Sequence, residues 1–232
     1  MIRNKRNEGY HATPPKTVDE LVARLNDIAG MTIADLARLA EVALPISPLH
    51  GKGFQGELIE RFLGASAPGL PVPDFTELGI ELKSVPLSAD MQPLESTFIC
   101  SAPLTGIRGL MFEDSVLWHK LRQVLYVFIV SPREYMYEDR YIAGFQFWAP
   151  SADDKKIIQQ DYEELMEMVA TGHIDDITAR FGTVIQLRPK AADGSALTDC
   201  PGPDGEIIRV RPRGFYMRRS FMLELMARFR RV

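Results

Sequence analysis

The stretch PDFTELGIELKSV, residues 73–85, alternates charged and aliphatic side chains in its second half. Glu81 and Lys83 are two positions apart, as are Ile80 and Leu82, and this period of two is typical of a β-strand. The aliphatic pair is predicted to face the core, so the glutamate and the lysine share the other face. The stretch therefore predicts a strand that enters a core while it displays a carboxylate next to an ammonium group.

The residues before this strand add a second carboxylate. Gly79 permits a turn, which would bring Asp74 back beside Glu81. Two adjacent carboxylates repel each other, and the pKa of one rises unless a cation neutralises the pair. Mg²⁺ prefers such a site and keeps waters that can be activated, while Lys83 would orient or deprotonate a water. The pattern indicates phosphodiester hydrolysis, and the alternative is an exposed strand face with an ordinary ion pair.

A helix predicted over residues 54–65 carries further acids. Glu57 and Glu60 lie one turn apart, and Glu60 is embedded among apolar residues, where an unpaired acid would be costly. This position favours a role for Glu60 in an acidic site. The alternative is an exposed glutamate that pairs with Arg61 or Lys52.

The composition limits the class of protein. The chain has 232 residues, 46% apolar and 25% charged, which is typical of a globular protein with a real core. Cys100 and Cys200 stand alone, which argues against structural zinc and favours two reduced thiols over a disulfide. The N-terminus has no apolar signal segment, and the apolar run at 124–130 is too short to cross a bilayer. We expect a cytoplasmic protein.

The charge is unevenly distributed along the chain. The net charge is −4, but residues 206–232 hold eight Arg against two Glu, a balance of +6. Within this tail, 207–219 carries five Arg and no acid, interrupted by aromatic residues. Such a stripe is typical of a phosphate-binding surface, and we expect Arg218 and Arg219 to contact nucleic-acid phosphates. The alternative is a solvated basic end that balances an acidic body.

Hydrophobic periodicity predicts a mixed α/β fold with one core and a loop-rich C-terminal lobe. Thr17 and Thr32 are expected to cap two short helices, separated by Gly30. The apolar stripes of these helices are Leu21, Leu25 and Ile28, then Leu36, Leu39 and Ala43. Further helices are expected at 54–65 and 113–122, after a Ser151–Asp154 cap, and from Ser220. Strands are expected at 80–85, 96–102, 124–130, 141–149, 183–189 and 206–212, with turns at 191–205 and 213–215.

Seven stretches of the chain form a wider pattern: GFQGELIERFLGASA, PDFTELGIELKSVP, PLESTFICSAPLTG, WHKL, ITARFG, LRPKAA and PRGFYMRRSF. In order and spacing, from about residue 17 to the end, they resemble the MutH family of DNA mismatch-repair endonucleases. The resemblance implies a restriction-endonuclease-like α/β fold, a mixed sheet flanked by helices, with a DNA-binding cleft between two lobes. It implies a single domain over 17–232, with an N-terminal catalytic lobe and a C-terminal DNA-recognition lobe. Residues 1–16 are expected to form a flexible N-terminal extension.

Carried over residue by residue, the resemblance makes Asp74, Glu81 and Lys83 the catalytic residues. It assigns the metal to Asp74 and Glu81, and it makes Glu60 an additional active-site acid. The DNA-contact residues that it implies are Lys120 at the cleft, Arg188, Pro189 and Lys190 in a base-reading loop, and Tyr216 at the adenine whose methylation is sensed. Arg and Lys suit base reading because guanine offers two acceptors in the major groove.

Other interpretations remain open at individual positions. Lys120 is alternatively a surface lysine, and Phe98, which matches a position near the DNA, is alternatively a core residue. Tyr216 would be held by the turn at 213–215, and its alternative role is phosphate contact or packing. The chain departs from the family at Trp118, where a more polar residue is expected, and within 191–207. These differences concern DNA contacts and leave the catalytic residues intact.

The function that the resemblance implies is Mg²⁺-dependent nicking of the unmethylated strand at hemimethylated GATC sites in double-stranded DNA. Family members are activated by MutL, downstream of MutS, and we expect a monomer. One alternative is a GATC-specific restriction endonuclease that breaks both strands, although the short chain favours the repair role. Another alternative is a catalytically silent DNA-binding module, which the complete Asp–Glu–Lys set disfavours.

Overall fold

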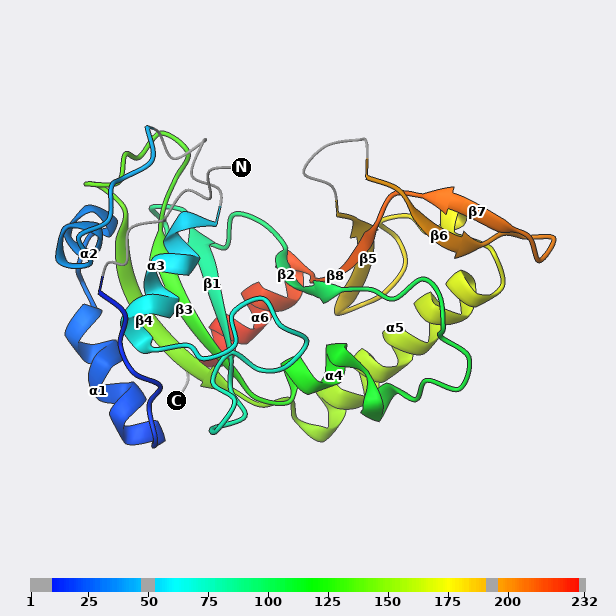
Figure 1. Cartoon of the computed structure of the whole chain (residues 1–232), viewed down its shortest axis with the longest axis horizontal. Helices are drawn as coiled ribbons and strands as arrows, with labels where there is room; N and C mark the ends of the chain where they lie inside the picture. Colours follow the sequence, from blue (N-terminus) through cyan, green and yellow to red (C-terminus); the bar gives the residue numbers. More distant parts are fainter. Residues whose placement is uncertain (1–9, 47–52, 191–195, 230–232) are drawn as a thin grey trace, which may run out of the picture. The chain divides into compact units, whose positions relative to one another are not determined.

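The computed structural model divides the chain into two compact units (Figure 1). The structure describes residues 10–46, 53–190 and 196–229. Unit 1 comprises Met1–Leu94 and Gln123–Trp148, and unit 2 comprises Glu95–Arg122 and Ala149–Val232. Each unit therefore combines two separate segments of the chain. The single domain over 17–232, with a cleft between two lobes, stays a prediction.

Unit 1 is built on a three-stranded sheet in the order β1-β3-β4. β1 (Glu81–Leu87) runs parallel to β3 (Val124–Val130), and β4 (Tyr141–Trp148) runs antiparallel to β3. All seven residues of β3 are buried, as expected of a continuous apolar run at the centre of a covered sheet. The predicted mixed α/β character is confirmed in this unit.

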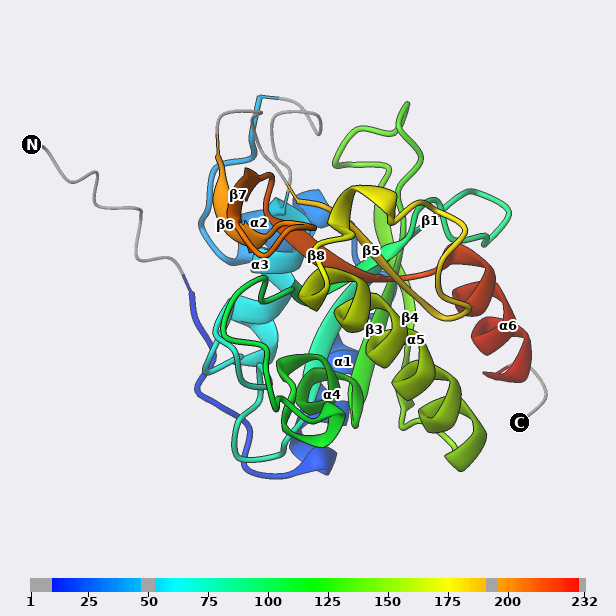
Figure 2. The same cartoon turned by 90° about the vertical axis from the view of Figure 1, so that its right-hand side faces the viewer.

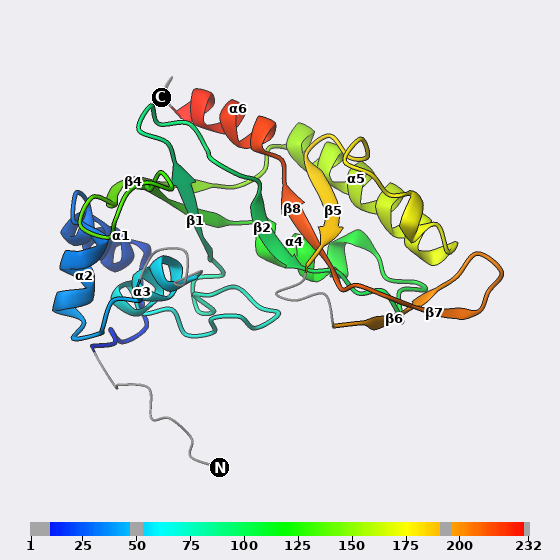
Figure 3. The ribbon, with the colours of Figure 1, turned by 90° about the horizontal axis from the view of Figure 1, so that it is seen from above.

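Three helices pack on one face of this sheet (Figure 3). They are α1 (Val18–Ile28), α2 (Ile33–Leu39) and α3 (Phe54–Leu63). Their buried side chains form one hydrophobic cluster with alternate residues of β3, namely Leu125, Val127 and Ile129. The predicted caps are confirmed, because the Thr17 and Thr32 side chains accept hydrogen bonds from the backbone N–H groups of Glu20 and Asp35.

The predicted apolar stripe of the second helix is wrong at its C-terminal end. α2 ends at Leu39, which is 46% exposed, and Ala43 lies beyond the helix. The buried positions are Ile33, Leu36 and Ala37, which follow the same period on a face rotated away from Leu39. The apolar residues of a short helix can be assigned to either of two faces, and packing against the sheet determines which face is buried.

Unit 2 is built on a second three-stranded sheet in the order β2-β8-β5, with antiparallel neighbours (Figure 2). The strands are β2 (Thr97–Ser101), β5 (Ile185–Pro189) and β8 (Arg213–Met217). The helices are α4 (Val116–Leu121), α5 (Ala152–Ala170) and α6 (Arg219–Phe229), with short 3-10 turns η1 (Phe112–Asp114) and η2 (Ile174–Asp176). A separate hairpin joins β6 (Thr198–Pro201) to β7 (Ile207–Val210).

Helix α5 covers one face of this sheet. It begins with the predicted capping box, in which Ser151 and Asp154 each accept a hydrogen bond from the other's backbone N–H. Its Tyr162 ring lies 5.6 Å, centroid to centroid, from the ring of Phe215 on β8. Because side chains alternate along a strand, the neighbouring residue Tyr216 points to the opposite face.

Three expectations for unit 2 need correction. Residues 213–215, predicted as a compact turn, begin β8, which pairs with strands on both sides. The predicted turn region 191–205 contains β6, and its residues 191–195 lie outside the described part of the chain. The helix predicted over 113–122 begins only at Val116, because the Ser115 side chain caps it. The two missed strands are set by pairing partners elsewhere in the chain.

The described part of the expected N-terminal extension packs on unit 1. The N–H of Tyr10 donates to the carbonyl of Ala40 (3.1 Å), and that of Ala12 donates to the carbonyl of Arg61 (2.9 Å). Residues 1–9 lie outside the described part, so the expectation of flexibility is untested there.

Two expectations from composition concern cysteines and membrane spans. Cys100 and Cys200 are buried free thiols, which confirms the prediction of two reduced cysteines. Within the residues that the structure describes, no helix combines the length and apolar character needed to cross a membrane.

Candidate active site and nucleic-acid interface

Asp74 is placed by a tight turn before β1. Phe75 and Ile80 form an antiparallel bridge with backbone hydrogen bonds of 2.9 and 3.3 Å, and Gly79 takes the left-handed conformation (φ 67°). The turn returns Asp74 to the start of the strand, where its Oδ2 accepts a hydrogen bond from the Leu82 N–H at 2.9 Å. Asp74 is only 4% exposed. The predicted turn at Gly79 is therefore present, and it carries the carboxylate to β1.

Glu81 and Lys83 share one face of β1, as the alternation predicts. The Lys83 Nζ donates to the Glu81 Oε1 at 2.6 Å. The Glu81 side chain is 1% exposed and that of Lys83 is 17% exposed, whereas Ile80 and Leu82 belong to the hydrophobic core. A charge-assisted bond of this length in a largely buried setting fixes both side chains.

Glu60 on α3 belongs to the same cluster. The pKa of its carboxyl is raised to about 7, chiefly by burial and then by the negative charges of Asp74, Glu57 and Glu81, while the positive charge of Lys83 lowers it. Among the described residues, the cation that acts on Glu60 is Lys83 and not Arg61, and the predicted alternative Lys52 lies outside them. We call Glu60, Asp74, Glu81 and Lys83 the acid cluster.

The acid cluster carries more negative than positive charge. It sets three carboxyl groups against one ammonium group, and this excess adds to the effect of burial in raising the pKa of Glu60. In the described part of the chain, no three His, Cys, Asp or Glu side chains are placed to hold a metal ion by themselves. Mg²⁺ commonly takes only one or two carboxylates and completes its shell with waters and substrate phosphate. Asp74 and Glu81 fit that requirement.

The predicted base-reading residues meet on the face of the unit 2 sheet opposite α5. Tyr216 and Phe98 are cross-strand neighbours with ring centroids 5.2 Å apart. The Arg188 guanidinium lies 5.3 Å from the centre of the Tyr216 ring, and the Lys190 Nζ lies 4.5 Å from that of Phe98. We call these four residues the aromatic–basic face. Phe98 is therefore not a core residue, and it contributes a ring to this face.

Hydroxyl groups hold the two cations in place. The Arg188 Nη1 donates to the Ser96 Oγ at 3.2 Å, and the Lys190 Nζ donates to the Ser101 Oγ at 2.9 Å. Both serines lie within the predicted strand 96–102 that carries Phe98, but no pattern in the sequence identifies them as partners of the two cations. A further missed residue is Gly214, where an added Cβ would lie 2.8 Å from the Phe98 ring. Glycine at this position leaves room for the phenylalanine.

Other predicted DNA-contact residues have different surroundings. Lys120, at 5% exposed, is buried on α4 and is not the surface lysine of the alternative interpretation. Pro189 is exposed at the end of β5. Trp118, the departure from the family pattern, packs against Phe112 (5.1 Å between ring centroids) and lies under the Lys155 Nζ (5.1 Å). Its immediate role is to join α4 to α5.

The two arginines after Tyr216 differ from each other. The Arg218 Nη2 donates to the backbone carbonyls of Ala179 (2.7 Å) and Phe181 (2.8 Å), so its guanidinium holds a neighbouring loop. Arg219 is exposed at the first residue of α6. The sequence, which presents them as an adjacent pair, gives no signal of this difference.

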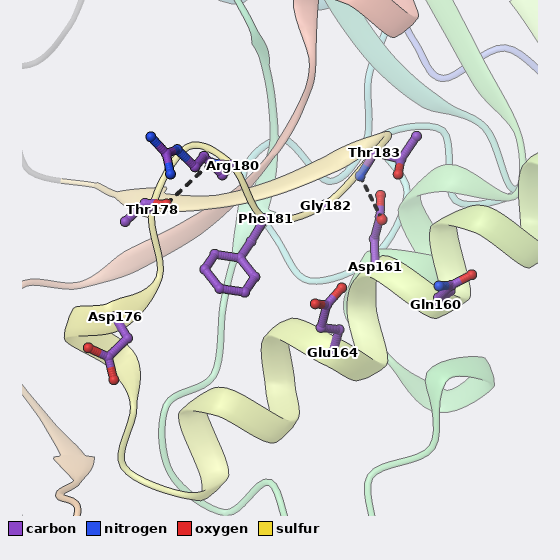
Figure 4. Close-up of a pocket in the computed structure, with 9 residues that line it drawn as sticks. All are labelled: Gln160, Asp161, Glu164, Asp176, Thr178, Arg180, Phe181, Gly182 and Thr183. Carbon is purple, nitrogen blue, oxygen red and sulfur yellow. Dashed lines mark hydrogen bonds between the residues drawn. The ribbon is translucent and has the colours of Figure 1, made fainter.

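A surface hollow of about 520 Å³ lies beside this loop (Figure 4). It is lined by Gln160, Asp161, Glu164, Asp176, Thr178, Arg180, Phe181, Gly182 and Thr183. The buried Asp161 carboxylate accepts hydrogen bonds from the backbone N–H groups of Thr183, Val184 and Ile185, at 2.7, 2.6 and 2.8 Å. This acid therefore anchors the chain, and the hollow is separate in its residues from the acid cluster.

Comparison with known proteins gives consistent matches. Residues 63–161 match the family model described as DNA mismatch repair enzyme MutH. The protein named DNA mismatch repair protein MutH from Serratia proteamaculans is 43% identical over 215 residues, which are 93% of this chain and 94% of that protein. Proteins of the same name from Shewanella sp. (strain ANA-3) and Vibrio cholerae (strain O395) are 42% and 43% identical, covering 92% and 93% of this chain and 96% and 97% of theirs.

Proposed function

This chain belongs to the MutH family of DNA mismatch repair enzymes, and we propose that it is a Mg²⁺-dependent endonuclease that nicks the unmethylated strand of hemimethylated GATC sites. As a family member it is a DNA endonuclease of mismatch repair. The observation that carries the proposal is the acid cluster, in which Asp74, Glu81 and Lys83 come together at the start of β1 beside Glu60.

Asp74 and Glu81 are the proposed metal ligands. The metal, when bound, would polarise a phosphate oxygen and activate a water for attack. The excess of carboxylates over ammonium groups in the acid cluster supports a divalent cation there, because the added positive charge relieves their repulsion.

The side chains of the acid cluster have further proposed tasks. Lys83, fixed by Glu81 at 2.6 Å, places a positive charge where negative charge develops on the phosphate, and it orients the attacking water. The turn at Gly79 and the Leu82 N–H hold the Asp74 carboxylate in one orientation, so little reorganisation is needed when DNA binds. Glu60 completes the cluster as an additional active-site acid.

Recognition of the DNA is proposed to lie in unit 2. Arg188 and Lys190 read guanine, with Pro189 between them, and Tyr216 meets the adenine amino group. Lys120 approaches the DNA at the active site, and Arg219 contacts a phosphate. The aromatic–basic face supports this assignment, because it brings Arg188 and Lys190 next to the rings of Tyr216 and Phe98.

The remaining proposals concern partners and cellular context. The protein acts as a monomer on double-stranded DNA in the cytoplasm, and MutL activates it after MutS has found a mismatch. The family's role in mismatch repair, which the names of the relatives state, supports these partners.

The test is a plasmid-nicking assay with Mg²⁺ on DNA whose GATC sites are unmethylated, hemimethylated or fully methylated. We expect nicked circles from hemimethylated plasmid, no product from fully methylated plasmid, and no product in EDTA. Addition of MutL should increase the nicking rate. Linear product from hemimethylated DNA would favour a restriction enzyme, and DNA binding without any product under all metal conditions would favour a silent binding module.

A further inference from the structure

The loop 178–182, which leads into β5, is held by the side chains of Gln186 on β5 and of Arg218, the residue between β8 and α6. The Gln186 Nε2 donates to the Ala179 carbonyl at 3.1 Å. The Arg218 Nη2 donates to the carbonyls of Ala179 and Phe181 at 2.7 and 2.8 Å. The carbonyls on either side of Arg180 are therefore both held by hydrogen bonds from side chains.

Hydrogen bonds also hold the residues that directly follow the loop. The buried Asp161 carboxylate accepts hydrogen bonds from three successive N–H groups, those of Thr183, Val184 and Ile185. Gly182 has a φ of 76°, and an added Cβ would lie 1.8 Å from the Ile185 carbonyl oxygen, so the chain turns as tightly as a glycine allows. The loop consequently has little freedom.

Arg180 is the residue between the two gripped carbonyls. Its side chain is exposed and points away from the Glu164 side of the hollow (Figure 4). Its own N–H donates to the Thr178 Oγ1 at 3.3 Å, which closes the turn beneath it. In the part of the chain that the structure describes, the Arg180 guanidinium has neither an ion pair nor a hydrogen bond. The loop thus presents a cation without an anion.

The position of Gln186 relates this cation to the aromatic–basic face. Gln186 is the cross-strand neighbour of Tyr216, and Arg188 follows it two positions later on β5, so the two share one strand face, while Lys190 lies directly after the strand. β5 is an edge strand of its sheet, and Gln186 reaches over to the loop beyond it. Arg180 therefore continues the row of cations past the edge of the sheet.

We propose that Arg180 binds a backbone phosphate of the DNA beside the base-reading side chains, and that Arg218 and Gln186 position it there. The inference rests on the proposed function. It gives Arg180 the phosphate contact that the sequence assigns to Arg218, whose guanidinium is occupied by backbone carbonyls. A guanidinium on a rigid loop loses less conformational freedom on binding a phosphate than one on a mobile loop.

The first experiment measures DNA affinity against salt concentration for Arg180→Ala, in EDTA so that no cleavage occurs. Loss of one phosphate contact should lower the slope of log K against log salt by about one unit, equally for a GATC duplex and a random duplex. Arg133→Ala, which removes an exposed arginine of unit 1, is the control and should keep the parent slope. An unchanged slope for Arg180→Ala overturns the inference, as does a loss confined to the GATC duplex.

The second experiment tests positioning with a double-mutant cycle. Arg218→Ala should lower the slope in the parent but cause almost no further loss in the Arg180→Ala background, because Arg218 acts through Arg180. Additive losses would mean that Arg218 is an independent phosphate contact, and the positioning role would be rejected. If Arg218→Ala fails to fold, Gln186→Met, which removes the other grip on Ala179, replaces it.

Failure of this inference differs from failure of the proposed function. A parent protein that binds DNA without GATC preference and never nicks it contradicts the proposed function. A parent that binds and nicks normally, with a slope that Arg180→Ala leaves unchanged, contradicts only the role of Arg180.

Discussion

The two units of the protein carry candidate sites of opposite charge. In unit 1, the acid cluster presses three carboxyl groups together against the single ammonium of Lys83. In unit 2, the aromatic–basic face places Arg188 and Lys190 over aromatic rings, with serine hydroxyls as their hydrogen-bond partners. The first set has an excess of negative charge, and the second has cations that rest on neutral groups.

This difference in charge indicates which kind of ligand each site would bind. Burial and the neighbouring carboxylates together raise the pKa of Glu60, and a bound cation would relieve the repulsion between the carboxylates. Among the described residues, the contacts of Arg188 and Lys190 are aromatic rings and hydroxyl groups, which leave their positive charge available for phosphates and guanine edges. A metal ion in unit 1 would neutralise the excess carboxylates, and DNA phosphates at unit 2 would neutralise the cations.

The largest effect should come from neutralising the acids of unit 1. We expect Asp74→Asn and Glu81→Gln each to reduce nicking by roughly a thousandfold or more, since metal-assisted charge stabilisation is worth several kcal/mol. DNA binding should stay intact or tighten slightly, because a negative charge near phosphates is lost. Single-turnover nicking and EDTA binding assays measure the two quantities separately.

Glu77→Gln is the matched control for these variants. Glu77 is an exposed acid in the turn between Asp74 and Glu81, so its loss removes charge without touching the cluster. Nicking by Asp74→Asn within tenfold of the parent rate would show that the metal-ligand assignment is wrong.

The next effect should come from removing a cation of unit 2. Lys190→Ala is expected to reduce GATC preference by about 1–3 kcal/mol, which is the usual value of one base contact. Arg219→Ala should instead weaken binding to all sequences and lower the salt slope by about one unit. Competition binding with GATC and scrambled duplexes distinguishes the two. Equal losses on both duplexes for Lys190→Ala would rule out base reading.

The sequence predicts unit 1 better than unit 2, and the reason is the range of the interactions. Within PDFTELGIELKSV, the alternation and Gly79 are local signals, and they place Asp74, Glu81 and Lys83 correctly on one turn and one strand. The helix caps at Thr17 and Thr32 are equally local. Local chemistry therefore predicts the acid cluster almost completely.

The aromatic–basic face depends on pairing between distant strands. β8 was predicted in part as a turn because Arg-Gly-Phe reads as one locally, while its partners β2 and β5 come from other parts of the chain. The serine contacts of Arg188 and Lys190 span 92 and 89 residues of sequence. No local sequence pattern predicts such contacts, and none predicts the hydrogen bond from Arg218 to the Ala179 carbonyl.

A smaller effect is expected for discrimination of the methyl group. Tyr216 lies between Phe98 and Arg188 on the central strand of its sheet, so its ring has little freedom. A rigid ring at the adenine edge should penalise an added methyl by about tenfold. We expect Tyr216→Ala to narrow the ratio of nicking rates on unmethylated and methylated strands more than it slows nicking of unmethylated DNA.

Matched oligonucleotides that differ only in the N6 methyl group measure this ratio under single-turnover conditions. Phe98→Leu is a useful companion variant, since it removes one ring of the face but leaves Tyr216 in place. A ratio unchanged by Tyr216→Ala would move methyl sensing to another residue, and Arg188 would be the next to test.

The smallest effect returns to the charge excess of unit 1 and concerns stability in EDTA. Glu60 has a pKa near 7 in the folded protein against 4.5 for the free side chain, so between these values the folded state holds a proton that the unfolded state has released. The free energy of unfolding should therefore fall as pH rises from about 5 to about 7, and the loss should be complete above pH 7.5 or so. Each pKa unit corresponds to about 1.4 kcal/mol, and partial exposure of Glu60 reduces the sum to roughly 1–2 kcal/mol. Urea unfolding across this range compares the parent with Glu60→Gln, which should lack this component, and with Glu77→Gln, which should keep it. Parallel profiles for the parent and Glu60→Gln would mean that neither burial nor the neighbouring carboxylates raise the pKa of Glu60 in the absence of metal, and the charge contrast between the two units would lose this support.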